Sequence, residues 1–259
     1  MTNPSTTTRT PRRAALVTGA SRGLGRTLSG FLAASGFDLV IDARGADDLA
    51  AAASALRAHG TAVIAVPGDV TDATHRERLV AAASDLGGLD LLVNNASTLG
   101  ASPLPHLVDA SPDTLRRTLE VNLIAPLSLV RAAVPLLERR GALIVSVSSD
   151  AALGAYEGWG AYGASKAALD LATRTLAAEL APRGIGAVAV DPGDMRTALH
   201  QLAFPGERID DRPDPDVTLP FWAWLTTQDP AAVSGQRFLA QDDVWTTARS
   251  GLAHAPVVL

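Results

Sequence analysis

Six short apolar runs of the chain are separated by segments of helical pattern, and this alternation is the strongest constraint on the fold. The runs are nearly continuous in apolar residues rather than alternating with polar ones, which is typical of parallel strands covered on both faces. They occupy residues 14–18, 37–43, 61–69, 89–95, 141–149 and 185–193. Helical patterns fill the gaps at residues 23–35, 47–59, 73–86, 114–140 and 160–181. Strands and helices in this order predict repeated βα units with right-handed crossovers.

These units predict one doubly wound, Rossmann-like α/β domain over residues 13–259, with a parallel sheet of about seven strands. The last strand is expected at residues 235–240. Residues 1–12 are expected to form a flexible arm. Residues 194–230 are rich in proline, aspartate and aromatic residues and break the regular pattern. We predict that they form a lid over a substrate, with a solvated insertion as the alternative.

The composition restricts the classes of function. The 259 residues are 47% hydrophobic and 19% charged, and the net charge of −5 offers no basic face for nucleic acid. The absence of cysteine excludes thiolate metal sites and is compatible with a reducing compartment. No run of about 18 apolar residues predicts a membrane span. We therefore expect a cytoplasmic protein that binds neither nucleic acid nor membrane, and no metal site is predicted.

A glycine-rich turn, TGASRGLG, joins the first predicted strand to the first predicted helix. Its three glycines have the spacing G-x-x-x-G-x-G. Glycine lets the backbone approach a pyrophosphate closely, and the helix N-terminus attracts the negative charge of that group. The alternative is that the turn needs glycine for its backbone conformation alone. The turn predicts a dinucleotide site at Gly19, Ser21, Arg22, Gly23, Leu24 and Gly25.

The end of the second predicted strand selects between the two nicotinamide dinucleotides. An acidic residue there binds the ribose 2′-hydroxyl of NAD, whereas an arginine accommodates the 2′-phosphate of NADP. The sequence reads Asp42, Ala43, Arg44, and Arg22 lies in the glycine turn. Adjacent strand residues face opposite ways, so the register decides whether Asp42 or Ala43 faces the ribose. We favour NADP(H), bound by Ala43, Arg44 and Arg22, and NAD stays the alternative.

Two more strands end in small polar segments. The third ends in GDV and the fourth in NNAS, on the carboxyl edge where open α/β sheets bind ligands. A turn-capping role for the asparagines is compatible with contact to a cofactor. The sequence therefore adds four residues to the predicted cofactor site, namely Asp69, Val70, Asn95 and Ala96.

Tyr162 and Lys166 are four residues apart in a predicted helix and therefore share one face. Lys166 is the one lysine in a chain that otherwise uses arginine for its cations. A nearby ammonium is expected to lower the pKa of Tyr162, which would let the phenol donate a proton to a carbonyl oxygen. A compact amine also reaches ribose hydroxyls better than a guanidinium does. The alternative is a surface Tyr–Lys pair on an amphipathic helix.

The order of motifs TGASRGLG, NNAS, VN in the long helix, a serine, YGASK and PGDMRT resembles the classical short-chain dehydrogenase/reductase family. The resemblance covers roughly residues 13–240. It implies a catalytic set of Asn122, Ser149, Tyr162 and Lys166. Ser149 polarises the substrate oxygen in this set, and Asn122 positions a water of the proton relay. It also implies contacts of the nicotinamide with Pro192, Gly193 and Thr197. The chain departs from the family at Ser97, where glycine is usual.

Three further residues are expected to line the substrate. Tyr156, Trp159 and Asp194 are the candidates. Aromatic residues gather again in the predicted lid, which favours an apolar or ring-bearing substrate, with packing of the lid or of a subunit interface as the alternative. They are Phe204, Phe221, Trp222 and Trp224. We expect His59, His75 and His106 at the surface or in loops. His200 follows the Thr197 segment and is a minor candidate to approach the cleft.

Together these features predict an NADP(H)-dependent oxidoreductase that reduces a carbonyl by hydride transfer, with Tyr162 as proton donor. One alternative is an NAD-dependent alcohol dehydrogenase with the same four catalytic residues. Another is a non-catalytic dinucleotide-binding scaffold, against which the complete catalytic set argues. The family resemblance also implies a homo-oligomer, either a tetramer or a dimer. The sequence does not identify the substrate.

Overall fold

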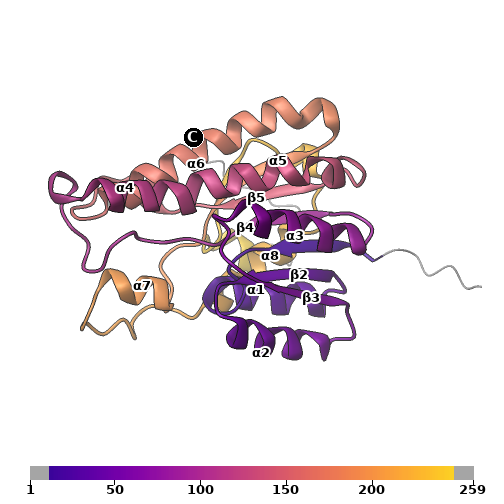
Figure 1. Ribbon diagram of the computed structural model, residues 1–259, viewed down its shortest axis with the longest axis horizontal. Helices are drawn as coiled ribbons and strands as arrows, with labels where there is room; N and C mark the ends of the chain where they lie inside the picture. Colours follow the sequence, from indigo (N-terminus) through magenta and orange to yellow (C-terminus); the bar gives the residue numbers. More distant parts are fainter. Residues whose placement is uncertain (1–11, 248–259) are drawn as a thin grey trace, which may run out of the picture.

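The computed structural model describes residues 12–247, and it confirms the predicted doubly wound, Rossmann-like domain. All but the last residue of the predicted arm, and residues 248–259, lie outside the described part. Seven parallel strands form one sheet in the order β3-β2-β1-β4-β5-β6-β7 (Figure 1). The strands are β1 (Ala14–Val17), β2 (Asp38–Ala43), β3 (Val63–Pro67), β4 (Leu91–Asn94), β5 (Leu143–Val147), β6 (Gly186–Asp191) and β7 (Arg237–Leu239).

Helices cover both faces of this sheet, which is why its strands are mostly apolar (Figure 1). One face packs against α1 (Gly23–Ala34), α2 (Ala46–Arg57) and α8 (Leu219–Leu225). The other packs against α3 (Ala73–Asp85), α5 (Ala125–Glu138) and α6 (Gly160–Leu180). Neighbouring residues of β1 enter opposite layers: Leu16 joins the second core, and Val17 joins the first.

The long helix expected at residues 114–140 is interrupted in the structure. α4 (Pro112–Leu119) leads into a π-helical turn at Glu120–Ile124 and then into α5. Ser111 caps α4 by accepting a hydrogen bond from the Thr114 amide. By length and composition, the stretch Pro112–Glu138 could cross a membrane. However, half of its most apolar 18-residue segment is buried inside the protein. The core helix of a soluble protein can have the same length and composition.

The predicted lid divides into two parts with different surroundings. Its first part contains α7 (Ala198–Ala203), and its second contains a 3₁₀ turn (Pro215–Thr218) and α8. Phe221 and Trp222 are fully buried, and Phe221 lies 5.7 Å from Phe238 of β7 between ring centroids. These two aromatics and their neighbour Trp224 therefore pack the core rather than the cleft. Motion of the first part as a lid stays a prediction.

Two short helices complete the described fold. α9 (Pro230–Val233) packs against β6, and α10 (Val244–Thr247) follows β7. The strand predicted at residues 235–240 is confirmed as β7, so the sheet has the expected seven strands. β7 pairs with β6, which places Leu239 beside Asp191 at the carboxyl edge of the sheet.

Candidate active site

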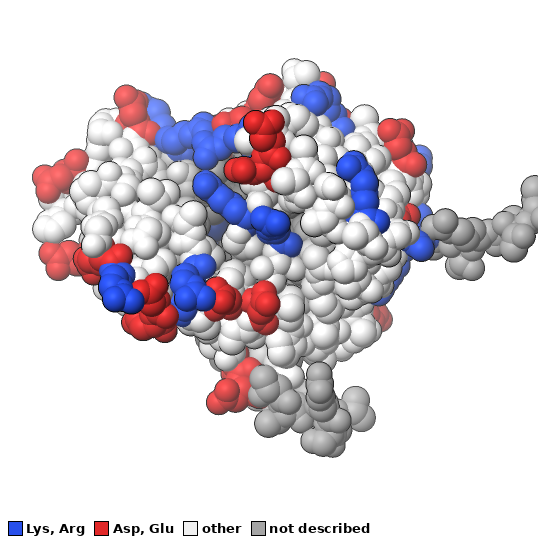
Figure 2. Space-filling model, turned by 90° about the horizontal axis from the view of Figure 1, so that it is seen from below, with Lys and Arg blue, Asp and Glu red and all other residues white. Residues whose placement is uncertain are grey.

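A pocket of about 590 Å³ lies at the carboxyl ends of the strands. Every residue predicted to bind cofactor or substrate lines it, and so do three of the four predicted catalytic residues, Ser149, Tyr162 and Lys166. Asn122 does not line the pocket. Figure 2 shows the molecule from below the view of Figure 1, with a hollow near the centre of this face and basic side chains along it. Contact of each lining residue with a ligand stays a prediction.

The glycine turn is built for close approach of the backbone to a ligand. Gly19 and Gly23 have positive φ angles of 68° and 53°, which favour glycine. A Cβ at Gly25 would lie 2.4 Å from the Gly19 carbonyl oxygen, so this position accepts no side chain. α1 begins directly after Arg22, whose side chain does not cap it. The uncapped amides at this helix N-terminus fit a pyrophosphate, which such amides bind well.

The side chain of Asn95 stabilises the glycine turn by hydrogen bonds to its backbone. Its Nδ2 donates to the carbonyl oxygens of Thr18 at 2.7 Å and Gly19 at 3.2 Å. The backbone amides of Asn95 and Ala96 both donate to Thr18 Oγ1 at 3.0 Å. Thr18 therefore ties the ends of β1 and β4 together, and sequence reasoning missed it. Its position as the first residue after a buried strand was the available signal.

The structure resolves which way the end of β2 faces. Asp42 is buried, and its Oδ1 accepts the Gly19 amide at 2.7 Å while its Oδ2 pairs with His75 Nε2 at 3.0 Å. Burial raises the pKa of Asp42, and the bonds from His75 and Gly19 oppose that rise. The carboxylate is therefore engaged inside the protein, beneath the glycine turn. Asp42, Ala43 and the exposed Arg44 all line the pocket, but the carboxyl oxygens of Asp42 are already bonded to Gly19 and His75.

The assignment of His75 to the surface or a loop was wrong, because only 2% of this residue is exposed. It lies on the buried face of α3 with Leu79, Ala82 and Ala83. The spacing of these residues is helical, so the period of the helix was the signal that would have placed His75 inward. His59 and His106 are exposed, as expected.

Tyr162 and Lys166 lie on one face of α6, as their spacing predicts, and both are buried. Lys166 Nζ lies 5.5 Å from the centroid of the Tyr162 ring and donates to the Val147 carbonyl oxygen at 2.7 Å. The expectation that Lys166 lowers the pKa of Tyr162 was wrong. Burial raises the Tyr162 pKa above its usual value, and the hydroxyls of Ser149 and Ser97 only partly oppose this. Burial also lowers the pKa of Lys166 to about 8.

Ser149 follows β5 and reaches the pocket beside Tyr162. Its Oγ donates to Asp150 Oδ1 at 2.9 Å and accepts a weaker bond from the Ala151 amide at 3.2 Å. A hydroxyl has one proton to donate, so Ser149 must turn away from Asp150 before it can donate to a substrate oxygen. Ser148 also lines the pocket, and its buried hydroxyl has no partner among the described residues, so the choice of Ser149 stays a prediction.

Asn122 lies at the centre of the π-helical turn and is buried. Its Oδ1 accepts from Ser97 Oγ at 3.1 Å and from the Thr98 amide at 2.9 Å. Its Nδ2 donates to the Thr98 carbonyl at 2.9 Å and to Ser165 Oγ at 3.0 Å. The side chain has thus filled its hydrogen-bonding capacity. It links the β4 loop to α6, and its amide has no free donor or acceptor for a relay water. Ser97, the departure from the family pattern, extends this link.

The end of the pocket beyond Tyr162 is apolar and aromatic. The Trp159 ring lies 5.6 Å from the Tyr162 ring in an edge-on arrangement and 6.3 Å from Phe204, both between centroids. Leu99 and Leu199 pack with this group. Tyr156, Asp194 and His200 complete the lining, so His200 does reach the cleft. Among the described residues, no group of three acidic, cysteine or histidine side chains is placed to hold a metal ion.

Comparison with known proteins agrees with this geometry. The family model for short chain dehydrogenases matches residues 13–208. Dehydrogenase/reductase SDR family member 4 of Pongo abelii is 37% identical over 193 residues, which are 73% of this chain and 68% of that protein.

Solved structures of short chain dehydrogenases are also similar to this chain. A short chain dehydrogenase structure from Pseudomonas syringae superposes with a TM-score of 0.82 at 31% identity, over 88% of this chain and 94% of the other. A short chain dehydrogenase from Shigella flexneri, solved in complex with NADP, gives 0.80 at 28% identity, over 89% and 97%. The chain belongs to the short-chain dehydrogenase/reductase family.

Proposed function

We propose that this enzyme is an NADP(H)-dependent oxidoreductase that reduces a carbonyl group. The inward orientation of Asp42 carries the choice of cofactor, because it removes the carboxylate that would bind the ribose of NAD. Arg44 and Arg22 are exposed at the same pocket, and neither forms an ion pair with another described side chain. Two free guanidiniums suit a 2′-phosphate. The NADP complex of the Shigella flexneri relative supports the same choice.

The catalytic residues have separate roles in this proposal. A bound reduced nicotinamide supplies the hydride. Tyr162 donates its phenolic proton to the carbonyl oxygen, and its raised pKa keeps it protonated for this step. Ser149 turns from Asp150 to donate to the same oxygen. Lys166, held by the Val147 carbonyl, binds the ribose and provides positive charge as the phenol loses its proton.

The pocket wall suggests the substrate class. Leu99, Trp159, Leu199 and Phe204 give the region beside Tyr162 an apolar and aromatic surface. We propose a small apolar or ring-bearing ketone or aldehyde as the substrate. Reduction is the physiological direction that we propose, since cells keep NADP mostly in its reduced form.

Removal of one guanidinium tests the choice of cofactor. We expect Arg44→Ala to raise the Kd for NADPH about tenfold or more, because a charge-assisted contact to the 2′-phosphate is lost. The Kd for NADH should change less than threefold, since NADH lacks that phosphate. Fluorescence titration of the purified protein with each nucleotide measures both constants.

The matched control is Arg174→Ala, which removes an exposed arginine of α6 that does not line the pocket. It should leave both Kd values unchanged. A wild-type protein that binds NADH as tightly as NADPH, or an Arg44→Ala protein that loses both equally, would contradict the NADP proposal and favour the NAD-dependent alternative.

We also propose that the enzyme is a cytoplasmic homo-oligomer. The lack of cysteine supports a reducing compartment. Exposed apolar side chains on α4, the π-helical turn and α6 support self-association. They are Leu119, Ile124 and Leu171.

A further inference from the structure

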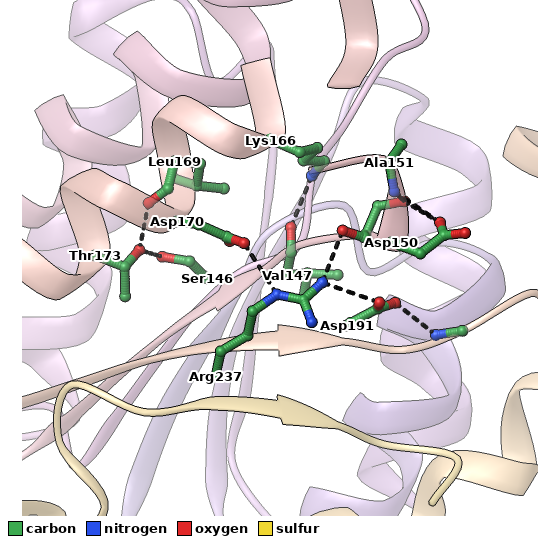
Figure 3. A network of polar contacts seen from close by, with 12 residues as sticks. Ser146, Val147, Asp150, Ala151, Lys166, Leu169, Asp170, Thr173, Asp191 and Arg237 are labelled. Atoms are coloured by element: carbon green, nitrogen blue, oxygen red, sulfur yellow. Dashed lines mark hydrogen bonds and ion pairs between the residues drawn. The ribbon is translucent and has the colours of Figure 1, made fainter. Parts of the chain in front are cut away.

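Arg237 of β7 is a charged residue buried behind the catalytic groups, with 8% of its surface exposed. Its guanidinium contacts three segments that are distant in sequence (Figure 3). Nε donates to Asp170 Oδ2 at 3.0 Å, and Nη2 donates to Asp191 Oδ2 at 3.0 Å and to the Ser149 carbonyl oxygen at 2.8 Å. Arg237 lies in the strand predicted at residues 235–240, and no sequence motif singles it out.

Each of these three segments carries part of the proposed active site. Ser149 is itself a catalytic residue, and Arg237 binds its backbone. Asp170 lies one helical turn after Lys166 in α6. Asp191 ends β6 directly before Pro192 and accepts the Gly193 amide on Oδ1 at 3.0 Å. One guanidinium therefore joins the serine, the helix of Tyr162 and Lys166, and the segment predicted to meet the nicotinamide.

The network is also balanced in charge. Asp170 and Asp191 are the anions, and Arg237 and Lys166 are the cations. Buried charges of one sign destabilise each other unless opposite charges lie close by. Arg237 alone bridges both carboxylates at hydrogen-bond distance, whereas Lys166 Nζ bonds to the Val147 carbonyl. Lys166 therefore interacts with the two carboxylates through space, and not through a direct ion pair.

This through-space interaction opposes the effect of burial on Lys166. Burial lowers the pKa of Lys166, and the negative charges of Asp170 and Asp191 raise it again, with a balance at about 8. The charged or titratable side chains around the amine on α6, β6, β7 and the turn after Ser149 are Tyr162, Asp170, Asp191, Arg237 and Asp150.

We propose that Arg237, Asp170 and Asp191 are positioning residues of the active site, which fix the Ser149 backbone and supply the negative charge that keeps Lys166 cationic. Arg237 holds the two carboxyl groups in place by donating a hydrogen bond to each of them. The kinetic part of this proposal rests on the proposed oxidoreductase activity. The part about the charge of Lys166 does not.

Asp170→Asn is the variant that separates charge from shape. The amide keeps the size of the side chain and an oxygen that accepts from Arg237 Nε, but it removes one negative charge. Lys166 is the one lysine of the chain, so ¹³C-labelled lysine gives a single side-chain NMR signal that reports its protonation directly. We expect the titration midpoint of this signal to fall by about one pH unit, the size of a nearby charge effect at moderate effective dielectric.

Asp85→Asn is the matched control, because Asp85 is an exposed residue at the end of α3. It should leave the midpoint of Lys166 unchanged. The deciding case is an Asp170→Asn protein that folds with an unchanged unfolding temperature. If its Lys166 titration midpoint equals that of Asp85→Asn, the proposal is wrong, and the network serves only to hold β7 on the sheet.

The pH profile of turnover provides a second measurement. With a carbonyl substrate, the loss of kcat at high pH should move to lower pH in Asp170→Asn, by the same amount as the NMR midpoint. A shifted NMR midpoint with no turnover of any carbonyl would contradict the proposed function and leave the charge network intact. If the NMR midpoint shifts but the loss of kcat at high pH stays at the same pH, the network does not act on catalysis and that part of the proposal is wrong.

Discussion

At the scale of single residues, burial governs the chemistry of the catalytic pair. Tyr162 and Lys166 both lie in the interior, so each favours its neutral form: the phenol is harder to ionise, and the ammonium loses its proton more easily. For Lys166, whose pKa is about 8, charge is present below that pH and is lost as the pH rises through it. In the proposed mechanism, carbonyl reduction needs a protonated Tyr162 and a charged Lys166, so we expect it to be favoured on the acidic side of this range.

The proton donor is tested by Tyr162→Phe, which removes the hydroxyl and keeps the ring against Trp159. We expect kcat for carbonyl reduction to fall by roughly 10²- to 10⁴-fold, the usual contribution of a positioned acid. Binding of NADPH should persist, because the glycine turn is untouched. Steady-state kinetics with nucleotide titration check both points. Turnover within tenfold of the wild-type rate would remove Tyr162 from the mechanism.

Sequence reasoning placed Tyr162 and Lys166 on one face of a helix correctly, because the signal for that placement is local. A spacing of four residues in a helix fixes which side chains share a face. The orientation of Asp42 was beyond the sequence, because it depends on the register between strands and on a partner, His75, that lies 33 residues further on. The pKa of Tyr162 was mispredicted for a related reason, since burial is a property of the whole fold rather than of a pair of residues.

At the scale of elements, the π-helical turn at Glu120–Ile124 determines what Asn122 can do. Turns of this type occur mostly inside α-helices and are frequent at functional sites. Here the turn presents an amide whose four hydrogen bonds connect the loop after β4 with Ser165 of α6. A helical pattern at residues 114–140 predicted the two flanking helices, but the interruption between them has no signature in hydrophobic spacing.

Asn122→Ala should therefore act mainly on stability. It leaves the Thr98 amide and carbonyl and the Ser165 hydroxyl without their partner, which we expect to lower the free energy of unfolding by about 2–4 kcal/mol. Urea denaturation followed by circular dichroism measures this value.

Thr175→Ala is the comparison for that measurement, because it removes an exposed hydroxyl from α6. Its effect should stay within about 0.5 kcal/mol. If Asn122→Ala costs less than about 1 kcal/mol, water must replace the lost bonds and the turn does not depend on this amide.

At the scale of the whole molecule, the sequence predicted the seven-stranded sheet correctly, because apolar strands between helices permit few arrangements. It was less successful after residue 194, where periodicity ends. The aromatics there split between the cleft, which receives Phe204, and the core, which receives Phe221 and Trp222. Composition alone does not distinguish these destinations, since both bury aromatic rings.

Self-association is the prediction that belongs to this scale. Ile124 and Leu171 are 46% and 60% exposed on neighbouring elements, the π-helical turn and α6. The double variant Ile124→Glu, Leu171→Glu places a charge at each position. It should be a monomer where the wild-type protein is an oligomer, because unpaired charges buried in an interface oppose assembly. Size-exclusion chromatography with light scattering gives the masses.

Val217→Glu is the control for assembly, since Val217 is an exposed apolar residue in the 3₁₀ turn before α8. It should leave the mass of the wild-type oligomer unchanged. A wild-type protein that is monomeric at micromolar concentration, or a double variant that keeps the oligomeric mass, would refute this interface.

The contrast between Asp42 and Ala43 has a consequence for protein redesign. All three residues line the pocket, but the Asp42 carboxyl group is bonded to the Gly19 amide and to His75, whereas Arg44 forms no side-chain hydrogen bond or ion pair with another described residue. If the proposed choice of cofactor holds, the position that supports the glycine turn and the positions that select the nucleotide are therefore separate, although they are adjacent in sequence. Substitutions intended to exchange one coenzyme for the other belong at residues 43 and 44, with Asp42 left in place.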